Sequence, residues 1–169
     1  MDRYQTLASQ LSAEEFASQF EHLFLVKRPA AKGSSAPSKL DFRTTIITTR
    51  RDGNRLEDDE FAASWVIEPI RKKPGSPFPE RISVGRAMNC DIPLRAAYIS
   101  KLHAYFVMEV GLPMRLVDNK SANGTWVDGR RLDGLTPMPV TAGSKICLGA
   151  LELQVVDPTQ LFYLLKATA

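Results

Sequence analysis

Residues 121–132, with the sequence SANGTWVDGRRL, place a short apolar run between two turn signals. Asp128-Gly129 matches a two-residue type I′ hairpin turn, which needs positive φ at both central positions. Asn123-Gly124 also favours a turn with a left-handed residue. The stretch therefore predicts a β-strand over residues 125–127, which a tight hairpin joins to the strand that follows.

Similar short runs recur on both sides of this hairpin, with turn residues between them. Short strands at close and even spacing are typical of a β-sandwich. The expected strands cover residues 64–70, 81–84, 103–110, 114–117, 125–127, 145–148 and 151–156. We therefore predict an all-β fold: a β-sandwich of two antiparallel-rich sheets over residues 61–157, with an N-terminal helix and a short C-terminal helix.

The N-terminal segment, residues 1–26, carries helical signals. Ser12 and Glu15 match a capping box, and Leu11 and Phe16 match the hydrophobic staple that accompanies it. Apolar residues then recur at helical spacing: Phe16, Phe20, Leu23 and Phe24. The resulting apolar face either packs on the main domain or docks a partner or a second copy, and the pattern leaves both readings open.

Two further segments flank the predicted sandwich. Residues 27–60 have the composition of a linker or tail, although residues 42–49 are β-branched and could form a strand. Residues 158–169 begin with a proline and predict a C-terminal helix whose apolar residues fall within 160–166.

Composition argues against several classes of function. Lys and Arg outnumber Asp and Glu by 13 to 12 in residues 1–81 and by 9 to 7 in residues 82–169, so no basic stripe indicates nucleic-acid binding. The two cysteines, Cys90 and Cys147, have no C-x-x-C spacing and no histidine at ligand spacing, so we expect no metal and no other cofactor. No apolar run approaches the roughly 18 residues of a membrane span. We expect a cytoplasmic protein without a membrane partner.

Polar side chains collect at three of the predicted turns. They are Gly85-Arg86, the SKLH sequence of residues 100–103, and the SANGT sequence of residues 121–125. Loops at the same end of a β scaffold can converge on one site. A guanidinium beside hydroxyl and amide donors suits a phosphate and the peptide that carries it.

These motifs resemble those of the forkhead-associated domain, a β-sandwich that binds phosphothreonine peptides. The resemblance spans about residues 64–156. It rests on ISVGR at 82–86, DIPL at 91–94, ISKLHA at 99–104, LVD at 116–118, SANGTWV at 121–127 and GSKICLG at 143–149. Each motif alone is weak evidence, whereas their order along the chain is specific.

The resemblance implies which residues contact the ligand. Arg86 and Ser100 are expected to bind the phosphate, Lys101 the phosphate or the peptide, and Asn123 the peptide main chain beside the phosphothreonine. Ala122 departs from the commoner pattern, because many relatives have a threonine or serine there that helps to hold the phosphate. A missing hydrogen bond to a charged group costs about 1.5–3 kcal/mol, so binding is expected either to be weak or to depend more on Lys101.

Three more residues are expected to support the site: Gly85, His103 and Gly124. His103 follows Ser100 by three residues, which would put the two on opposite faces of a strand and is poor geometry for a nucleophile and its base. The resemblance implies instead that His103 braces the loops through hydrogen bonds.

The sequence therefore predicts a non-enzymatic phosphothreonine reader that serves a Ser/Thr kinase pathway. The alternative is a scaffold of the same fold that binds its partner without phosphate, and Ala122 keeps this alternative open. The expected partners are a phosphothreonine protein or peptide and a Ser/Thr kinase. The ligand could also be the chain's own N-terminal segment, phosphorylated at one of its threonines: Thr44, Thr45, Thr48 or Thr49.

Overall fold

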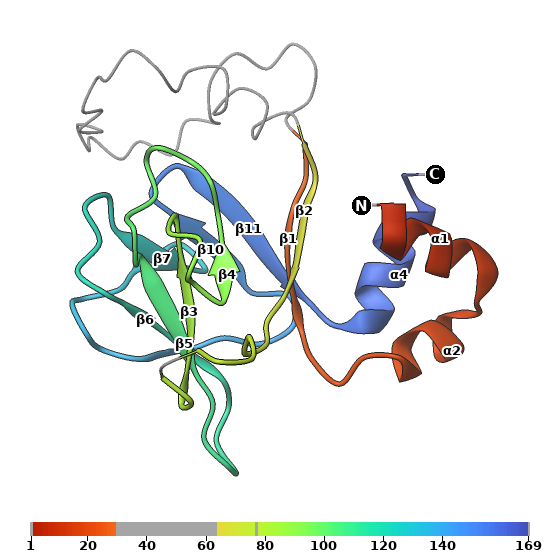
Figure 1. Ribbon diagram of the computed structural model, residues 1–169, viewed down its shortest axis with the longest axis horizontal. Helices are drawn as coiled ribbons and strands as arrows, with labels where there is room; N and C mark the ends of the chain where they lie inside the picture. The colour runs from red at the N-terminus through yellow and green to blue at the C-terminus, as the bar shows by residue number, and fades with distance from the viewer. Residues whose placement is uncertain (1, 30–63, 77, 169) are drawn as a thin grey trace.

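Two β-sheets face each other at the centre of the protein in the computed structural model, which describes residues 2–29, 64–76 and 78–168 (Figure 1). The six-stranded sheet has the order β2-β1-β11-β10-β7-β8, and the five-stranded sheet has the order β4-β3-β5-β6-β9. The strands are β1 (Phe24–Lys27), β2 (Val66–Pro69), β3 (Arg81–Gly85), β4 (Ile92–Pro93), β5 (Ala104–Val107), β6 (Arg115–Asp118), β7 (Thr125–Val127), β8 (Arg130–Arg131), β9 (Met138–Pro139), β10 (Lys145–Leu148) and β11 (Leu151–Val156). Only the β3–β4 pair is parallel among the described pairs, so the predicted all-β sandwich is confirmed.

The main core lies between the two sheets and follows from the alternation of side chains along each strand. On β5, Ala104 and Phe106 are buried while the residues between and after them are partly exposed. On the facing sheet, Leu151, Leu153 and Val155 of β11 point into the same cluster. The period of two that marks a half-buried strand therefore produces the sandwich directly.

The hairpin that the sequence predicts at Asp128-Gly129 is present. Asp128 and Gly129 have φ of 49° and 79°, and Val127 pairs with Arg130 across the turn. The long strand expected over residues 103–110 is shorter: β5 ends at Val107, because the chain then turns, with the Leu112 amide donating to the Glu109 carbonyl.

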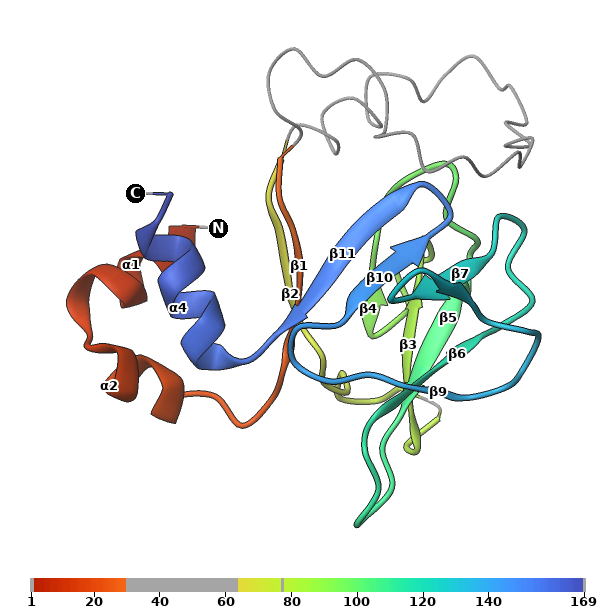
Figure 2. The ribbon, with the colours of Figure 1, turned by 180° about the vertical axis from the view of Figure 1, so that it is seen from behind.

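Three helices lie together on one side of the six-stranded sheet, beyond β1 and β2, as Figures 1 and 2 show from opposite sides. They are α1 (Asp2–Gln10), α2 (Ala13–Ser18) and α4 (Pro158–Lys166), and we call them the helical cap. The capping box is confirmed, since the Ser12 hydroxyl accepts from the Glu15 amide and the Glu15 carboxylate accepts from the Ser12 amide. Asp157 and Gln160 form a second capping box at the start of α4.

The prediction that the N-terminal helix continues through Leu23 and Phe24 is wrong. Helix α2 ends at Ser18, and Phe24 opens β1, where it pairs with Val156 of β11. The apolar spacing misled the prediction because Phe24 joins the same aromatic cluster as the helix: Phe20 lies 5.1 Å from Phe16 and 5.2 Å from Phe24 between ring centroids.

The apolar face of the N-terminal segment packs on the chain itself. Phe16 of α2, Phe162 of α4 and Phe24 of β1 belong to one buried cluster, which is separate from the main core. Strand β1 serves both clusters, because Leu25 points into the main core while its neighbours Phe24 and Val26 point toward the helical cap.

Two expectations concern other parts of the chain. The strand considered for residues 42–49 lies outside the described residues. Among the helices that the structure describes, none has the length and apolar character needed to cross a membrane.

Candidate functional site

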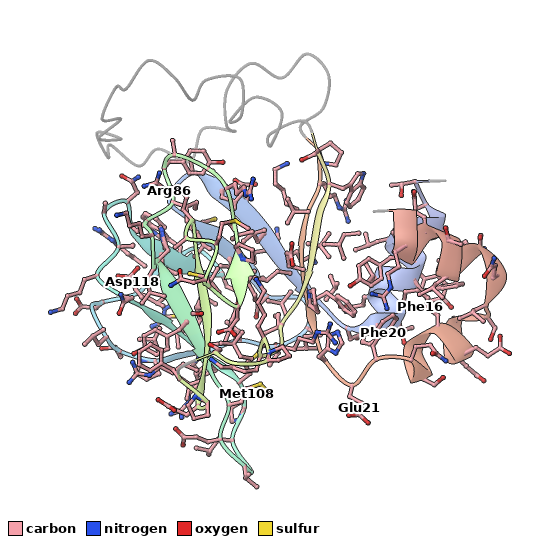
Figure 3. The ribbon with its side chains drawn as sticks, viewed as in Figure 1. Phe16, Phe20, Glu21, Arg86, Met108 and Asp118 are labelled. Carbon is pink, nitrogen blue, oxygen red and sulfur yellow. The ribbon has the colours of Figure 1, made fainter. Side chains whose placement is uncertain are left out.

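The three turns singled out in the sequence lie at one end of the sandwich, which we call the loop end. It consists of the connections 86–91, 94–103 and 119–124 and the β10–β11 turn at 149–150, and strands β3, β6 and β10 all run toward it. Figure 3 shows Arg86 at this end and Met108, on the β5–β6 hairpin, at the opposite end. The convergence expected from a β scaffold is therefore present.

Arg86 is fixed by its backbone and by one side-chain nitrogen. Its amide donates to the Ser100 carbonyl at 3.0 Å, and its Nε donates to the Ile99 carbonyl at 3.2 Å. The side chain is exposed, and among the described residues its terminal nitrogens Nη1 and Nη2 have no acceptor. The guanidinium is thus oriented while its two outer nitrogens remain available to a ligand.

Gly85 allows the Arg86 loop to lie close to the loop that contains Ser100 and Lys101. A β-carbon at Gly85 would overlap the carbonyl oxygen of Lys101, which belongs to the next loop. That carbonyl also accepts from the Ala87 amide at 3.1 Å and from the Cys90 thiol at 3.3 Å. Any side chain at Gly85 would push the Arg86 loop away from the Ser100 loop.

Ser100 links two loops. Its hydroxyl oxygen accepts from the Ala122 amide at 3.1 Å, so its hydroxyl proton remains free to point at a ligand. Its own amide donates to Nδ1 of His103 at 3.1 Å and is therefore not available to an anion. Lys101, the next residue, has an exposed side chain that contributes a positive charge to the same rim.

His103 is fully buried and connects the Ser100 loop to the Asn123 loop. Because Nδ1 accepts from the Ser100 amide, Nε2 carries the proton and donates to the Gly124 carbonyl at 3.0 Å. Burial lowers the pKa of His103, although the bond to Gly124 and the charge of Asp118 oppose this shift. A neutral histidine that bonds two backbone groups cannot also act as a base for the Ser100 hydroxyl.

Asn123 is oriented by the loop that precedes Ser100. Its Nδ2 donates to the Tyr98 carbonyl at 2.8 Å, which leaves the second amide hydrogen and the side-chain oxygen for other partners. Gly124 follows with φ of 82°, and its carbonyl accepts from both His103 and the Gly149 amide. The left-handed turn expected at Asn123-Gly124 therefore anchors the loop to two neighbouring elements.

Asp118 is a structural residue of the site that the sequence reasoning placed in the LVD motif without giving it a role. It is buried, and its carboxylate accepts from the Ser121 hydroxyl at 2.6 Å, the Thr125 hydroxyl at 2.6 Å and the Ser121 amide at 3.1 Å. The carboxylate thereby shapes the loop that holds Asn123. The available signal was an aspartate at a strand end with a serine three residues later.

Asp91, the last residue of the 86–91 connection, anchors that end of the connection to β3 and to the segment between β2 and β3. Its buried carboxylate accepts from the Ser83 amide and hydroxyl, at 2.8 and 2.7 Å, and from the Lys73 amide at 2.9 Å, and it pairs with Lys72 at 3.0 Å. Burial alone would raise the pKa of Asp91, but the hydrogen bonds outweigh it and hold the pKa well below its usual value. The carboxylate therefore stays ionised and bonded.

The arrangement is suited to binding an anion. It brings together all eight residues that the sequence reasoning selected: Gly85, Arg86, Ser100, Lys101, His103, Ala122, Asn123 and Gly124. Within the described ranges, no group of three or more His, Cys, Asp and Glu side chains could hold a metal ion. The exposed groups are donors and cations, which can grip a phosphate.

Comparisons with known proteins give a matching family model and a curated relative. The family model described as FHA domain matches residues 82–149, a range that includes the whole Arg86–Asn123 cluster. The E3 ubiquitin-protein ligase rnf8 of Danio rerio is 33% identical to this chain over 72 residues, which are 40% of this chain and 15% of the ligase. The chain thus spans about one seventh of the length of that curated relative.

Solved structures of FHA domains are among the structures that match this chain. The N-terminal FHA domain from S. cerevisiae Rad53p, in complex with a phosphothreonine peptide, has 19% identity and a TM-score of 0.47 over 59% of this chain and 90% of that chain. The FHA domain of an Arabidopsis thaliana hypothetical protein has 24% identity and a TM-score of 0.46 over 54% of this chain and 74% of that chain.

Proposed function

We propose that the loop end of residues 82–149, the range that the FHA-domain family model matches, binds peptides that contain phosphothreonine. One observation carries this proposal: hydrogen bonds connect the three loops in series. The Arg86 amide donates to the Ser100 carbonyl, and the Ala122 amide donates to the Ser100 hydroxyl. In this proposal, the outer nitrogens of Arg86 and the Ser100 hydroxyl donate hydrogen bonds to the same phosphate.

The charge of the site matches that of the ligand. A phosphothreonine carries about −1.5 to −2 charges near neutral pH and offers three acceptor oxygens. Arg86 supplies a planar pair of donors, and Lys101 supplies a point charge on the adjacent loop. The Asn123 amide lies on the third loop, where it is available to the main chain of the bound peptide.

The partner, in this proposal, is a protein phosphorylated by a Ser/Thr kinase, and the domain acts as a binding module in that kinase's pathway. Isothermal titration of the full chain with one peptide in its phosphothreonine and unphosphorylated forms tests the proposal. We expect binding of the phosphorylated form only. Equal affinity for both forms would contradict it and would favour the phosphate-independent scaffold that Ala122 keeps open.

The chain's own segment between β1 and β2 is a second candidate ligand. Lys27 pairs with Val66, so the chain leaves β1 and returns to β2 at one point, and β1 runs antiparallel to β11 toward the β10–β11 turn at the loop end. A tethered ligand can reach roughly millimolar effective concentration. The threonines concerned, which lie outside the described residues, are Thr44, Thr45, Thr48 and Thr49.

This second candidate has its own test. After phosphorylation by a Ser/Thr kinase, the chain should bind an external phosphopeptide more weakly than the unphosphorylated chain, or should form dimers in light scattering. The variant with all four threonines replaced by alanine should show neither effect. An unchanged affinity together with a monomeric phosphorylated chain would reject self-binding and leave the external ligand in place.

A further inference from the structure

The segment between β2 and β3 contains a hydroxyl group that the proposed function does not use. In the whole sequence, two hydroxyl residues are directly followed by proline: Ser76-Pro77 and Thr136-Pro137. Both hydroxyl residues lie in connections between strands. A proline directly after the acceptor is the signal that proline-directed Ser/Thr kinases read, so the surroundings of each hydroxyl decide what a phosphate there would do.

Ser76 ends a tight turn that faces outward. Its amide donates to the Lys73 carbonyl at 3.3 Å, and Gly75 within this turn has φ of 77°. No atom lies within 4 Å of the position that a β-carbon at Gly75 would take, so the outer side of the turn is open. Residues 73–75 and 78–80 are exposed. A kinase can therefore reach the chain on both sides of Ser76.

The hydroxyl of Ser76 lies against a buried carboxylate. It donates to Oδ2 of Asp91 at 3.4 Å, and the Asp91 side chain has an exposed fraction of 0%. The same oxygen accepts from the Ser83 hydroxyl at 2.7 Å and from Nζ of Lys72 at 3.0 Å. Thr136 differs, because it is exposed and no carboxylate of the described residues accepts from its hydroxyl.

A phosphate on Ser76 would change the charge around Asp91. Two ammonium groups lie beside this carboxylate: Lys72 pairs with it, and Nζ of Lys73 donates to the Cys90 carbonyl at 2.9 Å. A phosphate of about −2 charges turns the net charge of this group from one positive to about one negative. It also competes with Asp91 for the same ammonium groups. A buried carboxylate that loses its cation is strongly destabilising.

We infer that Ser76 is a site of phosphorylation by a proline-directed Ser/Thr kinase, and that the phosphate releases the segment between β2 and β3 from Asp91. In the reaction, Oγ of Ser76 bonds to the γ-phosphorus of ATP, the bond to the bridging oxygen breaks to give ADP, and the hydroxyl proton passes to the kinase's base. Oγ then has no proton to donate to Asp91, and the phosphate draws Lys72 away. The modification lowers the stability of the fold, whatever the loop end binds.

Labelling of the folded full chain tests the site. The chain is incubated with a proline-directed Ser/Thr kinase and ATP, and mass spectrometry locates the phosphate; a synthetic peptide of residues 70–80 is treated in parallel. We expect phosphate on Ser76 in the unmodified chain and in Thr136→Ala, and none in the chain that carries both Ser76→Ala and Thr136→Ala. Absence of phosphate from Ser76 of the folded chain would overturn the inference, whether or not the peptide is phosphorylated.

The consequence of the phosphate is tested in the Thr136→Ala chain, with and without phosphate on Ser76. We expect the phosphate to lower the melting temperature by about 5 °C, whereas Thr136→Asp, which adds a negative charge at the other proline-directed position, should shift it by less than about 2 °C. The amides of Lys73 and Ser83, which donate to the buried carboxylate, should exchange hydrogen at least about tenfold faster relative to the Val155 amide of β11. An unchanged melting temperature, or no selective gain in exchange at Lys73 and Ser83, would overturn the inference.

Discussion

The loop end and the helical cap are held together by different forces. At the loop end, the buried side chains of His103 and Asp118 hydrogen-bond the loops that surround the site. The buried Asp91 ties the 86–91 connection to Ser83 of β3. In the helical cap, Phe16 and Phe162 pack with ring centroids 5.6 Å apart in a cluster of apolar side chains. Hydrogen bonds fix direction, and apolar burial mainly supplies stability. Hydrogen bonds therefore set the geometry of the loop end, whereas apolar packing in the cap contributes mainly to stability.

The largest effect on stability is expected from Phe16→Ala in the cap. Phe16 is fully buried, and replacing a buried phenylalanine by alanine costs about 3–5 kcal/mol. Urea denaturation should show this loss in the free energy of unfolding, while phosphopeptide affinity, measured without urea on the folded protein, stays unchanged. Tyr163→Ala, at an exposed position of α4, serves as the control with a loss below about 1 kcal/mol. A large loss of affinity in folded Phe16→Ala would refute the separation of roles.

His103→Gln is expected to affect stability and binding together. The change breaks the bond from the Ser100 amide to Nδ1 and the bond from Nε2 to the Gly124 carbonyl. A buried polar group left without a partner costs about 1–3 kcal/mol, and both loops that carry the proposed ligand contacts lose their common anchor. Denaturation should show a lower free energy of unfolding, and peptide titration should show a lower affinity. Unaltered affinity would mean that His103 does not position the loops.

The same histidine gives a smaller effect that depends on pH. Because burial lowers the pKa of His103 in the folded state, the unfolded chain, with a histidine pKa of about 6.5, binds the proton more readily. The contribution of neutral His103 to the free energy of unfolding is complete above about pH 6.5. It is lost as the pH falls through the pKa of His103 in the folded state. The pKa of His22 is lowered in the same direction by burial and by Arg71. The test therefore compares the free energy of unfolding of the unmodified chain with that of His103→Gln at each pH. The difference between the two should shrink toward acid pH, and a constant difference would contradict this prediction.

The smallest change is expected from Ala122→Ser, which adds a hydroxyl beside Ser100. The Ala122 amide already donates to the Ser100 hydroxyl, so the new side chain begins at the rim of the site. One added hydrogen bond to a charged phosphate is worth about 1.5 kcal/mol, or roughly tenfold in affinity. Titration should show tighter binding of the phosphorylated peptide only. A similar gain for the unphosphorylated peptide would place the hydroxyl away from the phosphate.

The same contrast explains what the sequence could predict. Strand alternation, the Asp128-Gly129 hairpin and the capping box at Ser12 depend on neighbours along the chain, so local patterns identified them. The resemblance to a known family located the three loops. The end of α2 could not be predicted from local patterns. Phe24 packs in the cap cluster from strand β1, yet its position in the sequence also fits the spacing of a continuing helix.

The contacts that orient the site were harder to foresee. The Asn123 side chain donates to the carbonyl of Tyr98, and the Arg86 side chain donates to the carbonyl of Ile99. Both carbonyls belong to the 94–103 connection, 25 residues from Asn123 in the first case and 13 residues from Arg86 in the second. Backbone carbonyls carry no sequence signal, so only the folded arrangement reveals them. The carboxylate of Asp118 is similar, since its role depends on Ser121 and Thr125 folding back onto it.

Titration of Arg86→Ala with a phosphothreonine peptide tests the central claim most directly. The change removes two charge-assisted hydrogen bonds, each worth about 1.5 kcal/mol or more, so we expect affinity to fall by at least about 100-fold. The free energy of unfolding should fall by no more than about 1 kcal/mol, because Arg86 is exposed and its side chain makes one hydrogen bond to the described residues, with the Ile99 carbonyl. Arg3→Ala provides the control of equal charge. Affinity retained within about threefold in a folded Arg86→Ala protein would contradict the claim that the loop end binds phosphothreonine.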